Sequence, residues 1–270
     1  MKVSVITATT GNPFLSQCIE SVRAQTYKNV EHIVVVDGRD RWENAQAILD
    51  ACQFGSGWNE HLIILPYATG TDRYNGHRIY GACSYLANGD YFIFLDEDNA
   101  LEPNHVEALV NVAKENQLHW AYSFRKIIDK ENNLVCLDDC ESLGKWQSVL
   151  NDHFVDVNCF FVSKPLAAQI SPIWYRKARE PGVVEVDRAL TAVLMHPSNK
   201  LKFDCSMDYT VKYRVGNTQL SVRAEFFPRQ FPIMSSKHSL IALSKKFSSY
   251  RQLRISYSIF YCIIHTAVKL

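Results

Sequence analysis

Three acidic residues and an asparagine follow a short apolar run, and their types are suited to binding a charged ligand. The run is Tyr91-Phe92-Ile93-Phe94-Leu95, and the polar group that ends it is Asp96-Glu97-Asp98-Asn99. Asp96 and Asp98 are two residues apart, so at the end of a strand both carboxylates can face one cavity. Mg²⁺ and Mn²⁺ take such oxygen ligands, using one or two carboxylates together with substrate phosphates. The alternative is a solvated turn whose aspartates cap the next helix.

Two other apolar runs end in residues that could contact a nucleoside. Thr7-Ala8-Thr9 ends the first run, and Asp37-Gly38 ends the second, at residues 32–36. Ligands of open α/β sheets bind beyond the carboxyl ends of the strands. We therefore expect these two ends and the Asp96 group to line one site.

The elements that must position these residues alternate between strands and helices. Asn12-Pro13 can start a helix whose buried face is formed by Leu15, Cys18, Ile19 and Val22. Further helices are expected at 43–52, 76–86, 103–115 and 186–195, and further strands at 61–65, 119–126 and 154–163. Continuous apolar strands separated by helices predict an α/β fold with a mostly parallel central sheet and helices on both faces.

Composition limits the class of partner. The chain has 270 residues, and its 29 Lys and Arg against 28 Asp and Glu leave a net charge of +1. Nucleic-acid binders normally carry a strongly basic domain or stripe, so no nucleic-acid partner is expected. The 47% apolar fraction is that of a globular protein. We expect one main domain over residues 1–236.

The C-terminal segment, residues 237–270, differs from this domain. It combines scattered Lys and Arg with a strongly apolar stretch of 14 residues at 255–268. A helix of that length spans about 21 Å, short of the roughly 30 Å hydrocarbon core of a bilayer. The segment is predicted to be a basic, apolar helical tail that either contacts a membrane surface peripherally or packs on the domain. The eight cysteines include no CxxC pair and no secretory leader precedes the first strand, so reduced thiols and a cytoplasmic location are expected.

The order and spacing of these segments resemble the opening of family 2 glycosyltransferases. The resemblance covers about residues 1–110 and is carried by the segments 3–9, 15–27, 31–38, 73–76, 87–91 and 94–99. It implies the GT-A (nucleotide-diphospho-sugar transferase) fold, with a nucleotide-sugar-binding half at 1–110 and an acceptor half at 111–236. It also implies an enzyme that transfers a sugar from a nucleotide-diphosphate sugar, preferably a UDP-sugar, with inversion.

The resemblance implies roles for single residues. Asp98 would be the direct ligand of Mn²⁺ or Mg²⁺, and Asp96 would contact the metal, its water or the ribose. The metal would neutralise charge on the leaving diphosphate. Contacts to the nucleotide or donor are expected from Thr7, Ala8, Thr9, Asp37, Gly38, Arg73, Asn75 and Glu97. Arg214, in a late loop, is a candidate partner of the diphosphate.

Inversion also needs a general base that takes the proton of the acceptor hydroxyl. The family places this carboxylate at a helix start, and Asp187 is our choice, with Glu185 as the alternative. Many members have adjacent Glu and Asp at this point, whereas Val186 separates the two here. Both residues could instead only favour the helix dipole. Asp156 and Asn158 would share one strand face and contact the sugar or the acceptor, unless they lie on a solvent-facing edge strand.

Two other functions remain open. A noncatalytic sugar-nucleotide-binding protein would keep the pocket and lack turnover. A nucleotidyltransferase normally has a glycine-rich, basic loop after its first strand, whereas residues 7–13 contain one glycine and no Lys or Arg. The acceptor, whether a saccharide, a lipid-linked sugar or a small molecule, is not specified by the sequence.

Overall fold

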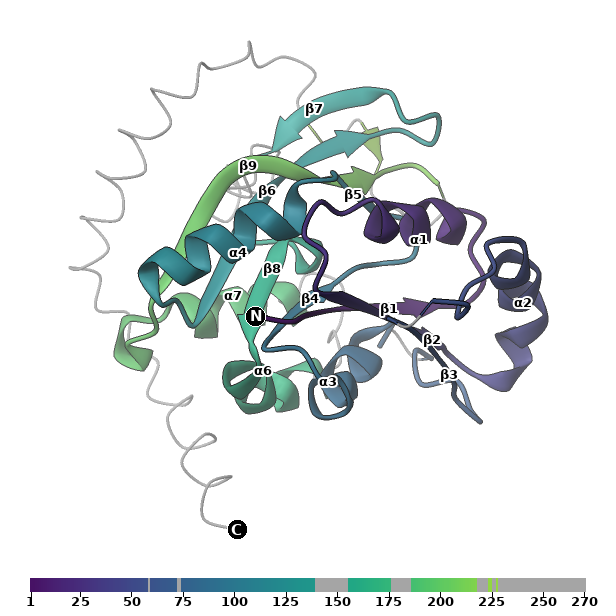
Figure 1. Cartoon of the computed structure of the whole chain (residues 1–270), viewed down its shortest axis with the longest axis horizontal. Coiled ribbons are helices and arrows are strands. Elements are labelled where there is room, and N and C mark those ends of the chain that lie inside the picture. Colours follow the sequence, from purple (N-terminus) through teal and green to yellow (C-terminus); the bar gives the residue numbers. More distant parts are fainter. Residues whose placement is uncertain are drawn as a thin grey trace. The chain divides into compact units, whose positions relative to one another are not determined.

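The structure of the chain is a computed structural model that describes residues 1–57, 59–71, 74–138, 155–175, 186–217, 223, 224 and 227. The strands are β1 (Val3–Thr9), β2 (Val30–Val36), β3 (Glu60–Ile64), β4 (Tyr91–Phe94), β5 (Ala100–Leu101), β6 (Trp120–Ile128), β7 (Leu134–Asp138), β8 (Phe160–Ser163) and β9 (Phe203–Arg214). The α-helices are α1 (Leu15–Arg23), α2 (Trp42–Ala51), α3 (His77–Leu86), α4 (His105–Asn116), α6 (Lys164–Ile170) and α7 (Val186–Met195). Figure 1 shows their arrangement.

The described strands form one nine-stranded sheet in the order β3-β2-β1-β4-β8-β6-β9-β5, with β7 paired to β6. The first four strands of this order are parallel to one another. Beyond them β8 is antiparallel to both β4 and β6, and β9 runs parallel to β6. The predicted α/β class is confirmed, and its parallel part carries the three strand ends that the sequence singled out.

The register brings those ends together. β1 lies between β2 and β4, with Thr9 opposite Val36 and Ile6 opposite Phe94. All three strands are almost completely buried, which is why their sequences are rich in apolar and β-branched residues. Their carboxyl ends therefore lie side by side at one edge of the sheet.

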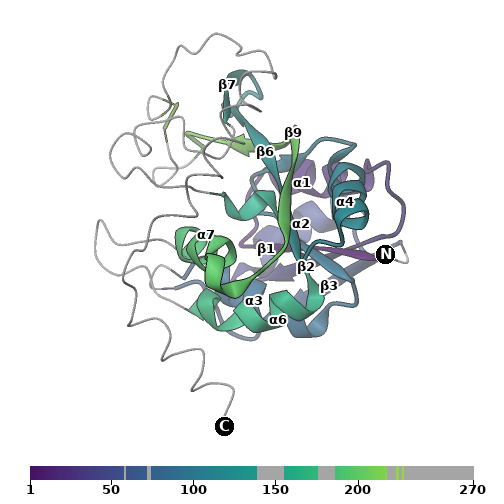
Figure 2. The same ribbon diagram turned by 90° about the vertical axis from the view of Figure 1, so that its left-hand side faces the viewer.

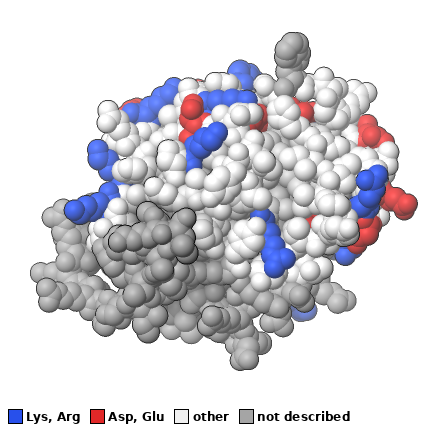
Figure 3. Space-filling model, turned by 90° about the horizontal axis from the view of Figure 1, so that it is seen from below, with Lys and Arg blue, Asp and Glu red and all other residues white. Residues whose placement is uncertain are grey.

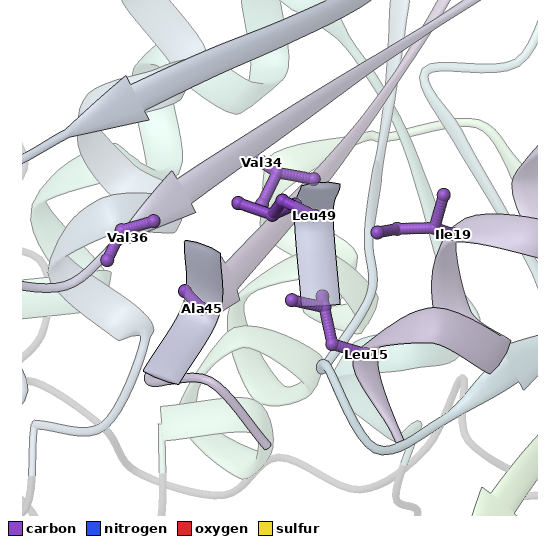
Figure 4. Close-up of a cluster of buried hydrophobic side chains, with 6 residues drawn as sticks. All are labelled: Leu15, Ile19, Val34, Val36, Ala45 and Leu49. Atoms are coloured by element: carbon purple, nitrogen blue, oxygen red, sulfur yellow. The ribbon is translucent and has the colours of Figure 1, made fainter. Parts of the chain in front are cut away.

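Two helices cover the face of the sheet above β2. α1 and α2 contribute Leu15, Ile19, Ala45 and Leu49 to a cluster with Val34 and Val36 of β2 (Figure 4). Burying a Leu or Ile side chain contributes about 1.5–3 kcal/mol. Leu15 and Ile19 are spaced so that they share one face of α1, and their burial fixes this face against the sheet. The position of the loop before α1 follows from it.

The opposite face carries α3 and α6, as Figures 1 and 2 show. There Trp174 packs against Tyr80 of α3 and Phe94 of β4, with ring centroids 5.5 and 4.9 Å away. This packing holds Tyr80 next to the end of β4. The prediction of helices on both faces is confirmed.

One predicted element is wrong. Residues 154–163 were expected to be a single strand, but only β8 is a strand, and Val157–Cys159 forms a 3₁₀ turn. The cause is Asp156, whose carboxylate accepts from the backbone N–H of Asn158 and so bends the chain. Asp156 and Asn158 consequently do not lie on a strand face.

The distribution of charged side chains on the surface agrees with the near-zero net charge of the sequence. In the view of Figure 3, Lys and Arg side chains are scattered and form no basic stripe on the visible face. Among the described residues, no helix has both the length and the apolar character needed to cross a bilayer. Cys18, Cys83 and Cys205 are buried thiols, as expected. The predicted tail, residues 237–270, lies outside the described residues.

Candidate active site

Polar side chains from the ends of β1, β2 and β4 meet at the carboxyl edge of the parallel strands. The backbone N–H of Asp37 donates to Thr9 O at 2.9 Å, and that of Leu95 donates to Ile6 O at 2.9 Å. These bonds continue the hydrogen-bond pattern of the sheet beyond the strand ends and fix where the following loops begin. The structure thus brings together the three strand ends that the sequence predicted to form one site.

Glu97 fastens the loop after β1 to the end of β4. Its Oε2 accepts from Thr9 Oγ1 at 2.5 Å and from the Asn12 N–H at 2.8 Å. Its Oε1 accepts from the N–H and the hydroxyl of Thr10, both at 3.0 Å. All four bonds go to the protein, so in this structure Glu97 organises the loop that begins at Thr9.

Asp96 is enclosed by protein donors. Tyr80 Oη donates to its Oδ1 at 2.6 Å, and Asn158 Nδ2 donates to its Oδ2 at 2.8 Å. The backbone N–H of Asp96 donates to Asn158 Oδ1 at 2.7 Å. Burial, followed by the nearby charge of Asp98, raises the pKa of Asp96 to about 7, despite the lowering effect of the Tyr80 bond. A positively charged partner would favour the ionised form of Asp96.

Asp98 is the second carboxylate of the pair. Its Oδ2 accepts from Asn217 Nδ2 at 2.6 Å. Burial, with the nearby Glu97 carboxylate contributing, raises its pKa, although the Asn217 hydrogen bond opposes the shift. Both acidic groups are therefore harder to ionise than exposed aspartates, and an added positive charge would favour their ionised forms.

The side chain of Arg214 holds the loop at Asp98 by a hydrogen bond to the backbone carbonyl of Asp98. Its Nε donates to Asp98 O at 3.0 Å, its Nη1 to Asp129 O at 3.1 Å and its Nη2 to Gln17 Oε1 at 2.9 Å. The guanidinium carbon also lies 3.9 Å from the centre of the Phe14 ring. Arg214 is buried, and the bonds named here tie four parts of the chain together; its predicted contact with a diphosphate stays a prediction.

Asp37 holds the loop that follows β3. Its Oδ1 accepts from the N–H and the hydroxyl of Thr69 at 2.6 and 2.8 Å, and its Oδ2 accepts from the Gly70 N–H at 2.8 Å. Gly38 has φ +106°, and an added Cβ there would meet Ala68 N at 2.8 Å. The backbone at Gly38 therefore lies directly against this loop, and only glycine fits there without strain.

The remaining predicted nucleotide contacts differ in their surroundings. Thr7 is buried, with its hydroxyl 3.0 Å from His32 Nε2 in the interior. Ala8 is half-buried, and an added Cβ on Gly76 would lie 2.7 Å from its Cβ. Asn75 is exposed in a left-handed conformation with φ +47°. Arg73 lies outside the described residues.

Asp156 and Asn158 adjoin Asp96 through a buried polar network. Asp156 Oδ1 accepts from Asn158 Nδ2 at 2.8 Å, and its Oδ2 pairs with Arg125 Nη1 at 2.6 Å. Arg125 pairs on its other side with Asp138, at 2.7 Å from Nη2. Asp156 and Asn158 were expected to contact the sugar or the acceptor. In the structure Asn158 contacts Asp96 directly, and Asp156 contacts Asn158.

The predicted general base lies at a helix start, as expected. α7 begins at Val186, and Asp187 is in its first turn, where its Oδ1 accepts from the Arg188 N–H at 2.8 Å. Thr191 of the same helix accepts from the Val155 N–H at 3.3 Å, which ties α7 to the segment that leads to Asp156. Glu185 lies outside the described residues.

The acidic pair has the chemistry of a site for a divalent cation shared with phosphate. Among the described residues, no three His, Cys, Asp or Glu side chains are grouped to bind a metal ion by themselves. Mg²⁺ commonly uses only one or two carboxylates and completes its shell with phosphate and water. Asp96 and Asp98 would be the two carboxylates of such a site, since both belong to the polar group that follows β4. The residues present therefore fit the expected Mn²⁺ or Mg²⁺.

Four residues of the site were not singled out from the sequence. Tyr80 was expected only as part of a helix, and Arg125 only as part of a strand. Gln17 and Asn217 carry polar groups that many surface positions also carry. Their roles depend on partners far away in the chain, as for Asp98 and Asn217, which are 119 positions apart. Local spacing carries no signal of such contacts.

Comparisons with known proteins agree with this geometry. Residues 4–168 match the family model of Glycosyl transferase family 2. A protein of Rickettsia bellii (strain RML369-C), described as an uncharacterized glycosyltransferase, is 29% identical over 140 residues, which cover 48% of this chain and 18% of that protein. The chain therefore spans less than a fifth of the length of this relative.

Solved structures of S. aureus TarS residues 1–349 share the fold. The complex with UDP superposes with a TM-score of 0.55 at 14% identity, covering 80% of this chain and 61% of TarS 1–349. The complex with UDP-GlcNAc gives a TM-score of 0.55 at 13% identity, covering 83% and 61%. At this identity the likeness concerns the fold, and it confirms the fold expected from the sequence.

Proposed function

Because the chain belongs to glycosyl transferase family 2, we propose that it transfers a sugar from a nucleotide-diphosphate sugar to an acceptor hydroxyl, with inversion at the anomeric carbon. The observation that carries the proposal is the Asp96–Asp98 pair, whose pKa values are raised at the joint ends of β1, β2 and β4. UDP is the proposed nucleotide, supported by the similar fold of TarS, which was solved with UDP and with UDP-GlcNAc.

Each residue of the site has a proposed part in this reaction. Asp98 and Asp96 would hold Mn²⁺ or Mg²⁺, which when bound supplies positive charge to the leaving diphosphate. The loops after β1 and β2, fastened by Glu97 and Asp37, would line the nucleoside site. Asp187 would accept the proton of the attacking hydroxyl, a role that its place in the first turn of α7 supports.

Calorimetric titration of UDP, GDP, CDP and dTDP, each with and without Mn²⁺, tests the donor site. We expect one nucleotide to bind more tightly with Mn²⁺. Asp98→Asn, which removes a charge at the metal, should lose about tenfold or more of that gain, in line with 1.5–3 kcal/mol for an interaction of a charged group. Asp50→Asn, on the exposed side of α2, is the control and should behave as the wild type. If none of the four nucleotides binds, with or without metal, the proposal is wrong.

Turnover separates an enzyme from a binding protein of the same fold. Asp187→Asn should keep the nucleotide affinity and lower donor turnover by about 10²–10⁴, the usual contribution of general base catalysis. A wild-type rate in this variant would exclude Asp187 as the base. Nucleotide binding by the wild type without transfer to any saccharide, lipid-linked or small-molecule acceptor would favour the noncatalytic alternative.

We further propose that the tail, residues 237–270, brings the protein to the cytoplasmic face of a membrane as a peripheral contact. The support is its combination of basic and strongly apolar residues. Flotation with anionic liposomes, comparing the full chain with a chain lacking 237–270, measures the contact. Equal recovery of both proteins would contradict it.

A further inference from the structure

Asp96 is held through its backbone and its carboxylate by one side chain, that of Asn158. Asn158 Oδ1 accepts from the Asp96 N–H at 2.7 Å, while its Nδ2 donates to Asp96 Oδ2 at 2.8 Å. The two residues are 62 positions apart, and one follows β4 while the other precedes β8. Because both main chain and side chain of Asp96 are fixed from the same group, its carboxylate has a defined direction as well as a defined position.

The orientation of the Asn158 amide is itself determined. Its Nδ2 donates to Asp156 Oδ1 at 2.8 Å in addition to Asp96 Oδ2. A backbone N–H can only donate and a carboxylate can only accept, so the flipped amide would place donor against donor and acceptor against acceptor. Asn158 is completely buried, which leaves water no access to repair such a mismatch.

Asp156 is anchored in turn by a buried ion pair. Arg125 Nη1 lies 2.6 Å from Asp156 Oδ2, and Arg125 Nη2 lies 2.7 Å from Asp138 Oδ2. Asp138 and Arg125 lie on the paired strands β7 and β6, at register positions opposite each other. The Arg guanidinium is rigid and planar, so two carboxylates on it are fixed relative to each other. The chain of contacts therefore runs from β7 and β6 through Asp156 and Asn158 to Asp96.

We propose that Asn158 is a positioning residue for the metal and diphosphate site, which directs the Asp96 carboxylate from an anchor formed by Asp156, Arg125 and Asp138. The positioning role rests on the proposed function, because Asp96 would be directed toward the cation and the diphosphate. It also replaces the expected contact of Asp156 and Asn158 with the acceptor by a contact with Asp96.

Asn158→Leu is the direct test, because leucine keeps the approximate size and removes all three amide interactions. Gln25→Leu is the matched control. Gln25 is another buried amide with three hydrogen bonds, from Nε2 to Ser21 O and Glu102 O and from the Val106 N–H to Oε1. It lies two residues beyond the end of α1, at the end of the helix remote from Phe14. Asn158→Ser provides a smaller substitution if the leucine variant does not fold.

The readout is the ratio of the UDP dissociation constants without and with Mn²⁺, measured by calorimetry on the full chain. Asn158→Leu should reduce this ratio about tenfold while metal-free UDP binding stays within about threefold of wild type. Amide hydrogen exchange over residues 95–99 should become faster in the same variant. Gln25→Leu should lose comparable thermal stability but keep both the wild-type ratio and the wild-type exchange.

The outcomes separate the two proposals. A folded Asn158→Leu or Asn158→Ser with the wild-type ratio and wild-type exchange at 95–99 overturns the positioning role and leaves the proposed function intact. A ratio lost equally in Gln25→Leu also overturns it, because the effect would then be one of stability alone. If the wild type binds none of UDP, GDP, CDP and dTDP, the proposed function is wrong and the positioning role falls with it.

Discussion

Replacing Glu97 by glutamine changes one atom of the site and leaves its shape. In the structure each carboxylate oxygen accepts two hydrogen bonds: Oε1 from the N–H and hydroxyl of Thr10, and Oε2 from the Thr9 hydroxyl and the Asn12 N–H. The glutamine amide has one oxygen and one NH₂ group. Whichever way it turns, its NH₂ faces a backbone N–H, of Thr10 or of Asn12, and two donors then oppose each other.

The cost follows from that count. One hydrogen bond to a charged acceptor is lost and one backbone donor is left without it, which would cost about 1.5–3 kcal/mol in a buried site. The bonds of Thr10 are exposed, so water can replace part of the loss. We therefore expect Glu97→Gln to lower the free energy of unfolding by about 1–2 kcal/mol, or roughly 2–4 °C in Tm for each kcal/mol.

The assay combines urea unfolding with UDP titration. Because the four hydrogen bonds of Glu97 order the loop after β1, we expect UDP binding to weaken by a similar factor with and without Mn²⁺. Glu115→Gln, on the exposed side of α4, serves as the control and should show neither effect. The reasoning is refuted if Glu97→Gln has wild-type stability, or if it weakens UDP binding only when Mn²⁺ is present, as a metal ligand would.

Further substitutions and pH changes test other parts of the structure. Burial lowers the pKa of three histidines, to about 3, 4 and 3 for His32, His77 and His105. Their unfolded forms take up protons below pH 6.5 while the folded forms do not, so stability is full above this value and falls as the pH is lowered towards 4. Between pH 7.5 and 5.5 the three histidines together should lower the free energy of unfolding by roughly 4 kcal/mol, and the raised pKa of Asp96 should offset part of this loss. A free energy of unfolding by urea that rises between pH 7.5 and 5.5 would contradict the burial of the histidines. Gly70→Ala would place a Cβ 2.5 Å from Asn75 O and 2.7 Å from Asp37 Oδ2. It should destabilise by about 1–3 kcal/mol and weaken UDP binding irrespective of metal, and unchanged calorimetric titrations would count against the Asp37 loop as part of the site. Arg214→Lys replaces a fork of donors by a single ammonium, so it should cost about 2–3 kcal/mol in urea unfolding. A cost near zero would show that the bonds to the carbonyls are replaceable.

The sequence predicts the parallel half of the fold well because that half is governed by local patterns. The apolar runs that became β1, β2 and β4 can only be buried strands in such a setting, and their polar ends meet because parallel neighbours end at one edge. The helix at Val186–Met195 was also predicted with the bounds that the structure has. Its apolar residues recur at helical spacing, which decides a helix without knowledge of what it packs against.

Parts of the second half depend on contacts that spacing does not encode. β9 was not predicted, although its residues Phe203–Arg214 alternate strictly between apolar and polar types, which is the pattern of a half-buried strand. The shifts in its register against β6, near Tyr122 and Phe124, are features that this pattern does not indicate. Asp156 was wrongly predicted to lie in a strand. Its carboxylate accepts a hydrogen bond from the Asn158 N–H and so favours a turn, a local competition that the apolar pattern around it does not reveal. Within the site, Asp98 could be proposed from its strand end, whereas the hydrogen-bond partners of Glu97 are 85 or more residues away and Asn158 lies 62 residues from Asp96.

The placement of β8 beside β4 has a consequence for the synthesis of the chain. Tyr91 pairs with Ser163, so the outer edge of β4 lacks its neighbour until about 70 further residues have left the ribosome. At about 5–20 residues per second this interval lasts several seconds. During it the parallel strands can assemble, but an apolar edge with unpaired backbone groups is exposed and open to wrong pairing with other chains. The segment that carries Asn158 to Asp96 is the same one that closes this edge. Asp96 therefore receives its hydrogen bonds from Asn158 in the same step that protects the nascent sheet from aggregation.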